Sequence, residues 1–175
     1  MNEIVIVLAP EYIVPLHKRH NRELFDCGNE PLNRYLKQQA RQDLEKRVAA
    51  PFVLVEPTTS IVRGYYTLSA SIISLDDLPE SQKKKLPRYG QLPVTLIGRL
   101  ARDKSINFKG VGEFLLMDAL RRSHEHAAQI AAMAVVVDAK DEAAESFYRH
   151  FNFLPFQQTP RRLFLPMHQM ATLFS

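Results

Sequence analysis

The chain has 175 residues, of which 46% are hydrophobic and 24% are charged, and its formal net charge is +4. These values exclude the disordered and collagen-like classes and predict one globular domain over residues 1–175. The chain has one cysteine, Cys27, which excludes an intramolecular disulfide and a cysteine-rich zinc module. A reducing, cytoplasmic environment is therefore expected.

The apolar segments are too short to cross a bilayer. Ile4–Ala9 follows an acidic start, unlike the basic start of a signal peptide. The longer run Ile130–Val137 has eight residues, against the roughly 20 that a transmembrane helix needs. We expect no membrane association.

The first half of the chain predicts one helix and three strands. Asn29 and Glu30 ahead of Pro31 mark a helix start, and apolar residues at every fourth position continue to about Glu45. Three strands follow, separated by turn residues, at Phe52–Glu56, Gly64–Leu75 and Val94–Ala101. The residues before the third strand, Asp76–Leu92, predict a polar loop with one short helical turn.

The second half predicts helices and strands in alternation. The elements are a helix at Glu113–His126, a strand at Met133–Asp138, a helix at Glu142–His150 and a strand at Leu163–Pro166. The strand at Met133–Asp138 is almost uninterruptedly apolar, as buried parallel strands are. The fold class is therefore α/β or α+β.

Positive charge is concentrated in two segments. Residues 81–109 contain eight basic residues and one acid, Asp103, and residues 147–175 contain three arginines and no acid. A clustered positive surface favours a polyanionic partner such as nucleic acid or a phosphorylated cofactor. From charge alone, an ordinary solvated face is an equally good interpretation.

A glycine-containing turn joins the third strand to the next helix. It reads Asn107-Phe108-Lys109-Gly110-Val111-Gly112. Glycines allow close approach of a ligand, and the free amides of a helix N-terminus attract phosphate. The spacing excludes both a dinucleotide-binding fingerprint and a P-loop. Taken by itself, the turn also fits an ordinary helix start.

Two motifs resemble those of the GNAT superfamily of N-acetyltransferases. Residues Asn107-x-x-Gly110-x-Gly112, after Arg99-Leu100-Ala101-Arg102, resemble its acetyl-coenzyme A motif, with Asn107 in place of Gln or Arg. The segment Asp141–Phe153 resembles a second signature, with Asp141 for the usual Asn and Asn152 for the usual Gly. Asn tolerates the left-handed conformation that closes a helix.

The whole chain resembles the GNAT toxins of bacterial type II toxin–antitoxin systems. The stretches that carry this resemblance are Phe25–Asn29, Leu32–Leu36, Gly64–Ser69, Ile97–Ala101 and Arg162–Met167. The resemblance implies the GNAT fold, a mixed central sheet flanked by helices. It also implies two central parallel strands, 94–102 and 132–138, that splay apart to admit the pantetheine arm.

The same resemblance implies a function. Such toxins transfer acetyl from acetyl-CoA to the α-amino group of aminoacyl-tRNA, which blocks translation. It further implies an antitoxin with a ribbon-helix-helix domain and allows a homodimer. Two alternatives stay open: acetylation of a protein N-terminus or a small amine, and a catalytically silent coenzyme-binding protein that acts through a partner.

Roles for individual residues follow from the resemblance. Tyr148 is expected to give a proton to the departing thiolate, because a phenol with a pKa of about 10 can protonate a thiolate of pKa about 8.5. A backbone amide near Leu100 or Ala101 is expected to stabilise the oxyanion. The expected coenzyme-binding residues are Leu100, Ala101, Arg102, Asn107, Phe108, Lys109, Gly110, Val111, Gly112, Glu113, Asp141, Ala144 and Phe147. The expected tRNA-binding residues are Lys83, Lys84, Lys85, Arg88, Arg99, Arg161 and Arg162.

No metal site is expected, although the chain has six histidines. His124 and His126 are two apart and point to different faces of a helix, and His17 and His20 lack a nearby carboxylate pattern. Cys27 has no histidine in a nucleophile arrangement, so a small buried or turn residue is its expected role.

Overall fold

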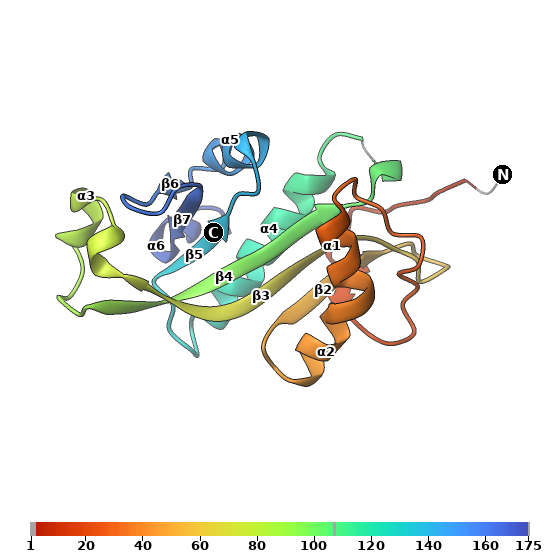
Figure 1. Ribbon diagram of the computed structural model, residues 1–175, viewed down its shortest axis with the longest axis horizontal. Coiled ribbons are helices and arrows are strands. Elements are labelled where there is room, and N and C mark those ends of the chain that lie inside the picture. Colours follow the sequence, from red (N-terminus) through yellow and green to blue (C-terminus); the bar gives the residue numbers. More distant parts are fainter. Residues whose placement is uncertain (1–2, 107, 175) are drawn as a thin grey trace. The chain divides into compact units, whose positions relative to one another are not determined.

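The structure of the chain is a computed structural model that describes residues 3–106 and 108–174 (Figure 1). It contains two compact units, Met1–Ser69 with Gly98–Ala119 (unit 1) and Ala70–Ile97 with Leu120–Ser175 (unit 2). Three elements belong partly to each unit: β3 (Val62–Ser74), β4 (Gln91–Arg102) and α4 (Val111–His126). That the whole chain acts as one domain stays a prediction.

Within the described residues, seven strands form one mixed sheet in the order β1-β2-β3-β4-β5-β7-β6. The β4–β5 pair is parallel, and β5 and β7 are antiparallel. The predicted mixed sheet with helices is therefore confirmed. The remaining strands are β1 (Ile13–Pro15), β2 (Ala50–Val55), β5 (Ala134–Asp138), β6 (Leu154–Pro155) and β7 (Arg162–Pro166).

The helix predicted after Asn29 is confirmed and contains an irregular segment. α1 (Glu30–Arg34), a π-helical segment (Tyr35–Gln39) and α2 (Ala40–Glu45) follow one another directly. The Asn29 side chain caps α1 by accepting a hydrogen bond from the Leu32 amide at 3.1 Å. A sequence period of four residues does not distinguish a π-helical turn from an α-helical one, so the prediction missed it.

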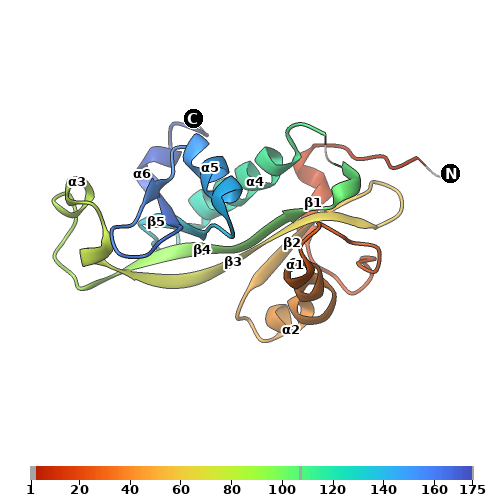
Figure 2. The same cartoon turned by 45° about the horizontal axis from the view of Figure 1, so that its top comes forward.

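In unit 1, helices pack on both faces of β2 and β3. Tyr35, Leu36 and Ala40 share a buried cluster with Val53 and Tyr65. Successive strand residues face opposite sides, so Gly64 faces away from this cluster. A Cβ on Gly64 would lie 3.1 Å from the Leu115 side chain of α4. The missing side chain lets the first half of α4 pack closely against β3, on the face opposite α1 and α2 (Figure 2).

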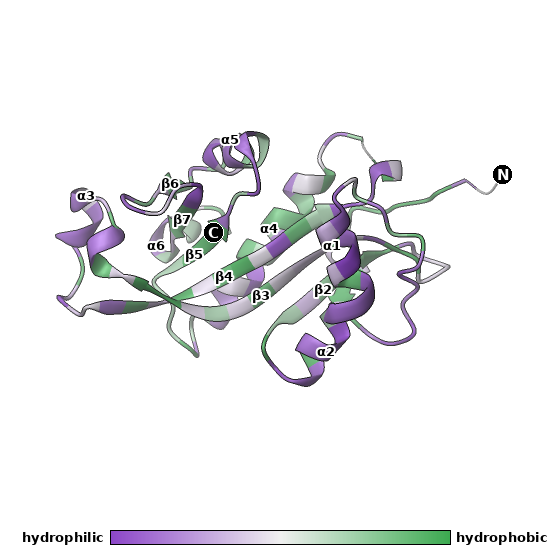
Figure 3. Cartoon of the chain, in the orientation of Figure 1, coloured by the Kyte–Doolittle hydropathy of each residue, from purple (hydrophilic) through white to green (hydrophobic). Residues whose placement is uncertain are grey.

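Unit 2 is built around β5 and β7. β5 is buried at every residue except Asp138, in agreement with its hydrophobic colouring (Figure 3). Val136 and Phe164 pack with Val94 and Phe156 in one cluster. Unit 2 also contains α3 (Glu80–Lys83), α5 (Glu142–His150) and α6 (Met167–Met170), of which α6 contacts β5 and β7.

The parallel pairing of β4 with β5 covers three positions, from Thr95–Val135 to Ile97–Val137. β5 ends one residue later at Asp138, whereas β4 continues to Arg102. The pairing of the two central strands thus stops before the end of β4. The residues beyond that point, from Gly98, lead into the glycine turn.

Strand limits differ from the predictions where prolines and short pairings are involved. β4 begins at Gln91 instead of Val94. Proline has no backbone N–H to donate to a neighbouring strand. Pro93 takes part through its carbonyl, which accepts a hydrogen bond from the Met133 amide at 2.9 Å. β1 and β6 were not predicted, because strands of three and two residues have no detectable alternation.

Candidate functional site

The glycine turn ends at the N-terminus of α4. Gly110 has φ +96°, a left-handed conformation that favours glycine. Its carbonyl accepts the first α-helical hydrogen bond, from the Phe114 amide at 2.9 Å. The amides of Val111, Gly112 and Glu113 have no acceptor within the helix, as at every helix start. The turn therefore presents three donors at the positive end of a 16-residue helix.

Space is open around this turn. A Cβ built on Gly110 would meet no atom within 4 Å. Phe108 is 49% exposed and Lys109 is exposed. Asn107 lies outside the described residues. The turn thus combines two properties that an anion site needs, amides without an acceptor in their own helix and room for a ligand beside Gly110.

The end of β4 leads into the turn. The Ala101 side chain is buried in the unit 1 core, and Leu100 is half-buried. The Arg102 guanidinium donates to the carbonyl of Ile106 at 3.3 Å. The Ala101 side chain therefore belongs to the core, whereas the Arg102 guanidinium uses one of its donors on the Ile106 carbonyl.

Tyr148 lies in α5 of unit 2, with its ring in an apolar environment. The ring packs against Phe147 and Phe153, with centroid distances of 5.3 and 5.5 Å. The residue is 8% exposed, and burial raises the pKa of Tyr148 to about 12. The phenol is therefore protonated at neutral pH.

The Tyr148 hydroxyl reaches solvent although the ring does not. No hydrogen bond joins this hydroxyl to another described residue, and among the described residues no fully buried side-chain N or O atom lacks a partner. The hydroxyl must therefore be accessible. A protonated phenol whose hydroxyl is accessible and makes no hydrogen bond to a described residue has the chemistry of a general acid.

Other predicted residues of α5 are occupied within the helix. The Asp141 carboxylate caps α5 by accepting from the Ala144 amide at 2.8 Å. Phe147 packs edge-on against Phe151 at 5.1 Å. The Asp141 carboxylate and the Ala144 amide are thus hydrogen-bonded to each other.

The predicted basic residues differ in whether they are neutralised. Arg162 forms two hydrogen bonds with Asp138, at 2.8 and 3.0 Å, and Lys83 lies 3.5 Å from Asp76. The Arg161 guanidinium donates to the carbonyl of Lys140 at 3.3 Å. In contrast, the structure shows no ion pair for three exposed cations among the described residues: Lys84, Lys85 and Arg88.

Arg99 has an aromatic partner that the sequence did not indicate. Its guanidinium carbon lies 3.5 Å from the centroid of the Tyr35 ring, a cation–π geometry. Tyr35 is held by a 2.7 Å hydrogen bond from its hydroxyl to Asp43 and by stacking on Tyr65. Tyr35 opens the π-helical segment, and such segments occur frequently at functional sites.

The structure groups the predicted residues into two sets. Residues 99–113 and the Tyr35 ring lie in unit 1, whereas residues 83–88 (the lysine loop), α5 and Arg161–Arg162 lie in unit 2. Over residues 3–106 and 108–174, no group of three or more His, Cys, Asp or Glu side chains is arranged to hold a metal ion. In the same residues, no helix has the length and apolar character needed to cross a membrane.

Comparison with known proteins decides the family, although no family model matches the chain. The chain is 30% identical over 173 residues to the probable toxin TacT of Sinorhizobium fredii, which covers 94% of this chain and 96% of that protein. The chain belongs to the GNAT acetyltransferase toxins of toxin–antitoxin systems. It is also 30% identical over 149 residues to a tRNA-acetylating toxin of Mycobacterium tuberculosis, covering 85% of this chain and 87% of that one.

Solved GNAT toxins have the same fold. AtaT complexed with acetyl-methionyl-tRNAfMet matches with a TM-score of 0.87 and 29% identity, over 93% of this chain and 98% of that chain. AtaTR bound with AcCoA matches with a TM-score of 0.82 and 29% identity, over 93% and 97%. A mutant of AtaT bound to the C-terminus of the antitoxin AtaR matches with a TM-score of 0.80 and 26% identity, over 93% and 97%.

Two features of this GNAT toxin had no role in the predictions from the sequence. The Tyr35–Arg99 stack joins residues 64 positions apart, which no local pattern reveals. Asp103 did stand out as the one acid among the basic residues 81–109. An acid in that setting signals a buried partner for cations and amides, and the structure shows it 3% exposed.

Proposed function

We propose that this protein is a toxin that transfers the acetyl group of acetyl-CoA to the α-amino group of an aminoacyl-tRNA and thereby blocks translation. The observation that carries the proposal is the likeness over nearly the whole chain to AtaT, whose solved complex contains acetyl-methionyl-tRNAfMet. The identity to the tRNA-acetylating toxin of M. tuberculosis supports the same substrate class.

The glycine turn is the proposed coenzyme site, because it fits the diphosphate of acetyl-CoA. The amides of Val111, Gly112 and Glu113 supply donors, and open space at Gly110 lets a phosphate approach the backbone. Acetyl-CoA supplies the activated acetyl thioester. The backbone of Leu100 and Ala101 would hold the reacting carbonyl, since their side chains are wholly or partly buried. From the family resemblance, the further residues that we propose for coenzyme binding are Arg102, Asn107, Phe108, Lys109, Asp141, Ala144 and Phe147.

The acceptor amine needs little activation. A free α-amino group has a pKa of roughly 7.7 to 8.0, and the neighbouring ester lowers it further. A large neutral fraction is therefore present at pH 7, and no strong general base is required. As the new C–N bond forms, the attacking nitrogen gives one proton to water, and as the C–S bond breaks, the leaving thiolate must gain one. We assign this second transfer to the Tyr148 hydroxyl, which water then reprotonates.

The coenzyme site is tested with two variants of Gly112. Gly112→Asp and Gly112→Asn differ by one charge, and both replace a poor helix former near the N-terminus of α4. Both should fold, since an acid there is favourable to the helix. We expect Gly112→Asp to bind acetyl-CoA at least about tenfold more weakly than Gly112→Asn, which is about 1.4 kcal/mol of repulsion from the diphosphate. Calorimetry measures both affinities, and equal affinities would place the diphosphate elsewhere.

The assigned proton donor is tested with Tyr148→Phe, which keeps the ring and removes the hydroxyl. Transfer of radiolabelled acetyl to charged tRNA should slow by roughly 10²- to 10⁴-fold, with acetyl-CoA affinity unchanged. Tyr89→Phe is the matched control, because Tyr89 is 66% exposed and should transfer at the normal rate. Because the pKa of Tyr148 is raised to about 12, its hydroxyl stays protonated and should cause no loss of rate below about pH 10. An unchanged rate in Tyr148→Phe assigns the proton transfer to another group.

The tRNA is proposed to bind through cations that the protein leaves unneutralised. Lys84, Lys85 and Arg88 fit this role better than Lys83 and Arg162, which have carboxylate partners. Arg161 keeps most of its donors free. Arg99 is also proposed. Its guanidinium lies over the Tyr35 ring, and none of its N–H groups forms a hydrogen bond with a described residue. Contacts of this kind position RNA phosphates without reading sequence.

The tRNA surface is tested by salt dependence. Changing Lys84, Lys85 and Arg88 to Ala should weaken binding of charged tRNA and flatten the plot of log affinity against log salt by roughly 0.7 to 0.9 per lost contact. Changing the exposed Lys18, Arg19 and Lys46 to Ala removes the same charge and should leave the slope unaltered. Identical slopes in the two triple variants would remove the lysine loop from the tRNA surface.

Partners and location follow from the same proposal. The complex of AtaT with the antitoxin AtaR supports an antitoxin partner for this chain. From the family resemblance we further propose that the antitoxin carries a ribbon-helix-helix domain, that the toxin forms a homodimer, and that it acts in the cytoplasm, where charged tRNA is found.

A further inference from the structure

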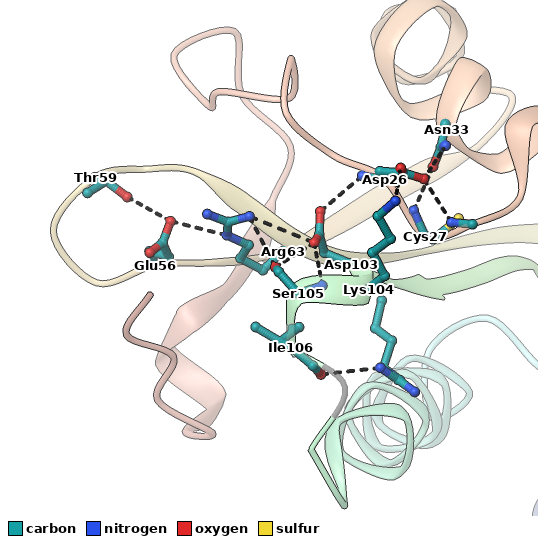
Figure 4. A network of polar contacts seen from close by, with 12 residues as sticks. Asp26, Cys27, Asn33, Glu56, Thr59, Arg63, Asp103, Lys104, Ser105 and Ile106 are labelled. Atoms are coloured by element: carbon teal, nitrogen blue, oxygen red, sulfur yellow. Dashed lines mark hydrogen bonds and ion pairs between the residues drawn. The ribbon is translucent and has the colours of Figure 1, made fainter. Parts of the chain in front are cut away.

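A buried carboxylate stands where β4 leaves the sheet. Asp103 is 3% exposed, and its side chain accepts hydrogen bonds from the Asp26 amide at 2.9 Å, the Ser105 amide at 2.9 Å and the Ser105 hydroxyl at 2.5 Å (Figure 4). The carboxylate therefore joins the segment before α1 to the segment that leads into the glycine turn.

A buried arginine, Arg63, lies between this carboxylate and a second one, Glu56. The Arg63 guanidinium lies 3.8 Å from Asp103 and 3.3 Å from Glu56, and it also donates to the Ser105 hydroxyl at 3.3 Å. Arg63 and Glu56 are 8% and 6% exposed. Buried ions of this kind hold one geometry, because displacing any of them leaves another unpaired.

Backbone contacts extend the network along residues 103–106. The Asp103 amide donates to the Arg63 carbonyl at 2.7 Å, the Lys104 amide to the Asp26 carbonyl at 2.8 Å and the Ile106 amide to the Asp103 carbonyl at 3.1 Å. The Ile106 side chain is 1% exposed. Every residue of this segment is thus fixed, up to the residue before the turn.

The Asp26 carboxylate also has several hydrogen-bond donors in this network. It accepts from the Lys104 ammonium at 2.8 Å, the Gly28 amide at 2.9 Å and the Asn33 side chain at 3.0 Å. The hydrogen bond from Lys104 is the largest cause that holds the pKa of Asp26 well below its ordinary value. Asp26 therefore stays ionised and anchored at neutral pH.

We propose that Asp103 is a positioning residue for the coenzyme site. It is buried, and its contacts hold residues 103–106, the described segment that precedes Gly110 and the amides of α4. The inference rests on the proposed coenzyme site at that turn. It predicts that removing hydrogen bonds to Asp103 weakens acetyl-CoA binding and leaves the rate of acetyl transfer at saturating acetyl-CoA unchanged.

Asp103→Asn tests the proposal with the smallest change. The Asn side chain has the shape of Asp, but an NH2 donor replaces one of its two acceptor oxygens. The hydrogen bonds from Asp26 and Ser105 therefore cannot all be kept. We expect the KM for acetyl-CoA to rise roughly 10- to 100-fold, because small displacements of binding groups have effects of this size. The kcat and the KM for charged tRNA should stay within about twofold of normal.

Asp77→Asn is the matched control. Asp77 also fastens a loop through its carboxylate, by accepting from the Gln158 amide at 2.5 Å and the Thr159 hydroxyl at 2.6 Å, but it lies in unit 2 and outside the turn. Its KM for acetyl-CoA should not change. If Asp103→Asn does not fold, Ser105→Ala removes only one donor to the same carboxylate and should raise the same KM severalfold.

The outcomes separate the inference from the proposed function. A wild-type protein that does not bind acetyl-CoA in calorimetry overturns the proposed function. Normal wild-type binding together with an unchanged KM in Asp103→Asn, or in Ser105→Ala if that variant is the one used, overturns the inference alone. A fall in kcat with no change in that KM also overturns it, because a general structural defect acts in that way.

Discussion

The start of α4 is the constraint on which the rest of this structure depends. A helix that begins at the surface leaves its first amides without acceptors, and here the turn before it adds no side chain at Gly110 to cover them. Two further features keep this end in place. Gly64 lets Leu115 pack closely against β3, and the Asp103 network fixes the entering segment. The anion site that we propose at this turn therefore depends first on backbone geometry.

Elements with strong local signals were predictable from the sequence. The Asn29 cap, the apolar strand β5 and the helix α5 agree with the predictions because each depends on residues within one short segment. The alternation of strands and helices indicated the α/β or α+β class, and the family resemblance implied the mixed sheet. The glycine turn does lie between β4 and α4, but α4 begins at Val111, two residues before the predicted start, so Gly112 belongs to the helix.

What the sequence could not provide depends on long-range contacts. Two such contacts are the Tyr35–Arg99 stack and the hydrogen bond from the Asp26 amide to the Asp103 carboxylate, which join residues far apart in the sequence. The neutralisation of Arg162 by Asp138 depends on the register of β5 and β7. Charge counting treats all cations alike, and only the structure separates the paired cations from Lys84, Lys85 and Arg88.

The chemistry proposed for the protein requires an acceptor that carries its own reactive amine, and this requirement gives the most direct test. The protein should be incubated with acetyl-CoA and a pool of charged tRNA, the aminoacyl esters hydrolysed, and the released amino acids analysed by mass spectrometry. The account predicts amino acids acetylated on the α-amino group. Unmodified amino acids from the tRNA, together with acetylation of protein N-termini or small amines under the same conditions, would contradict it.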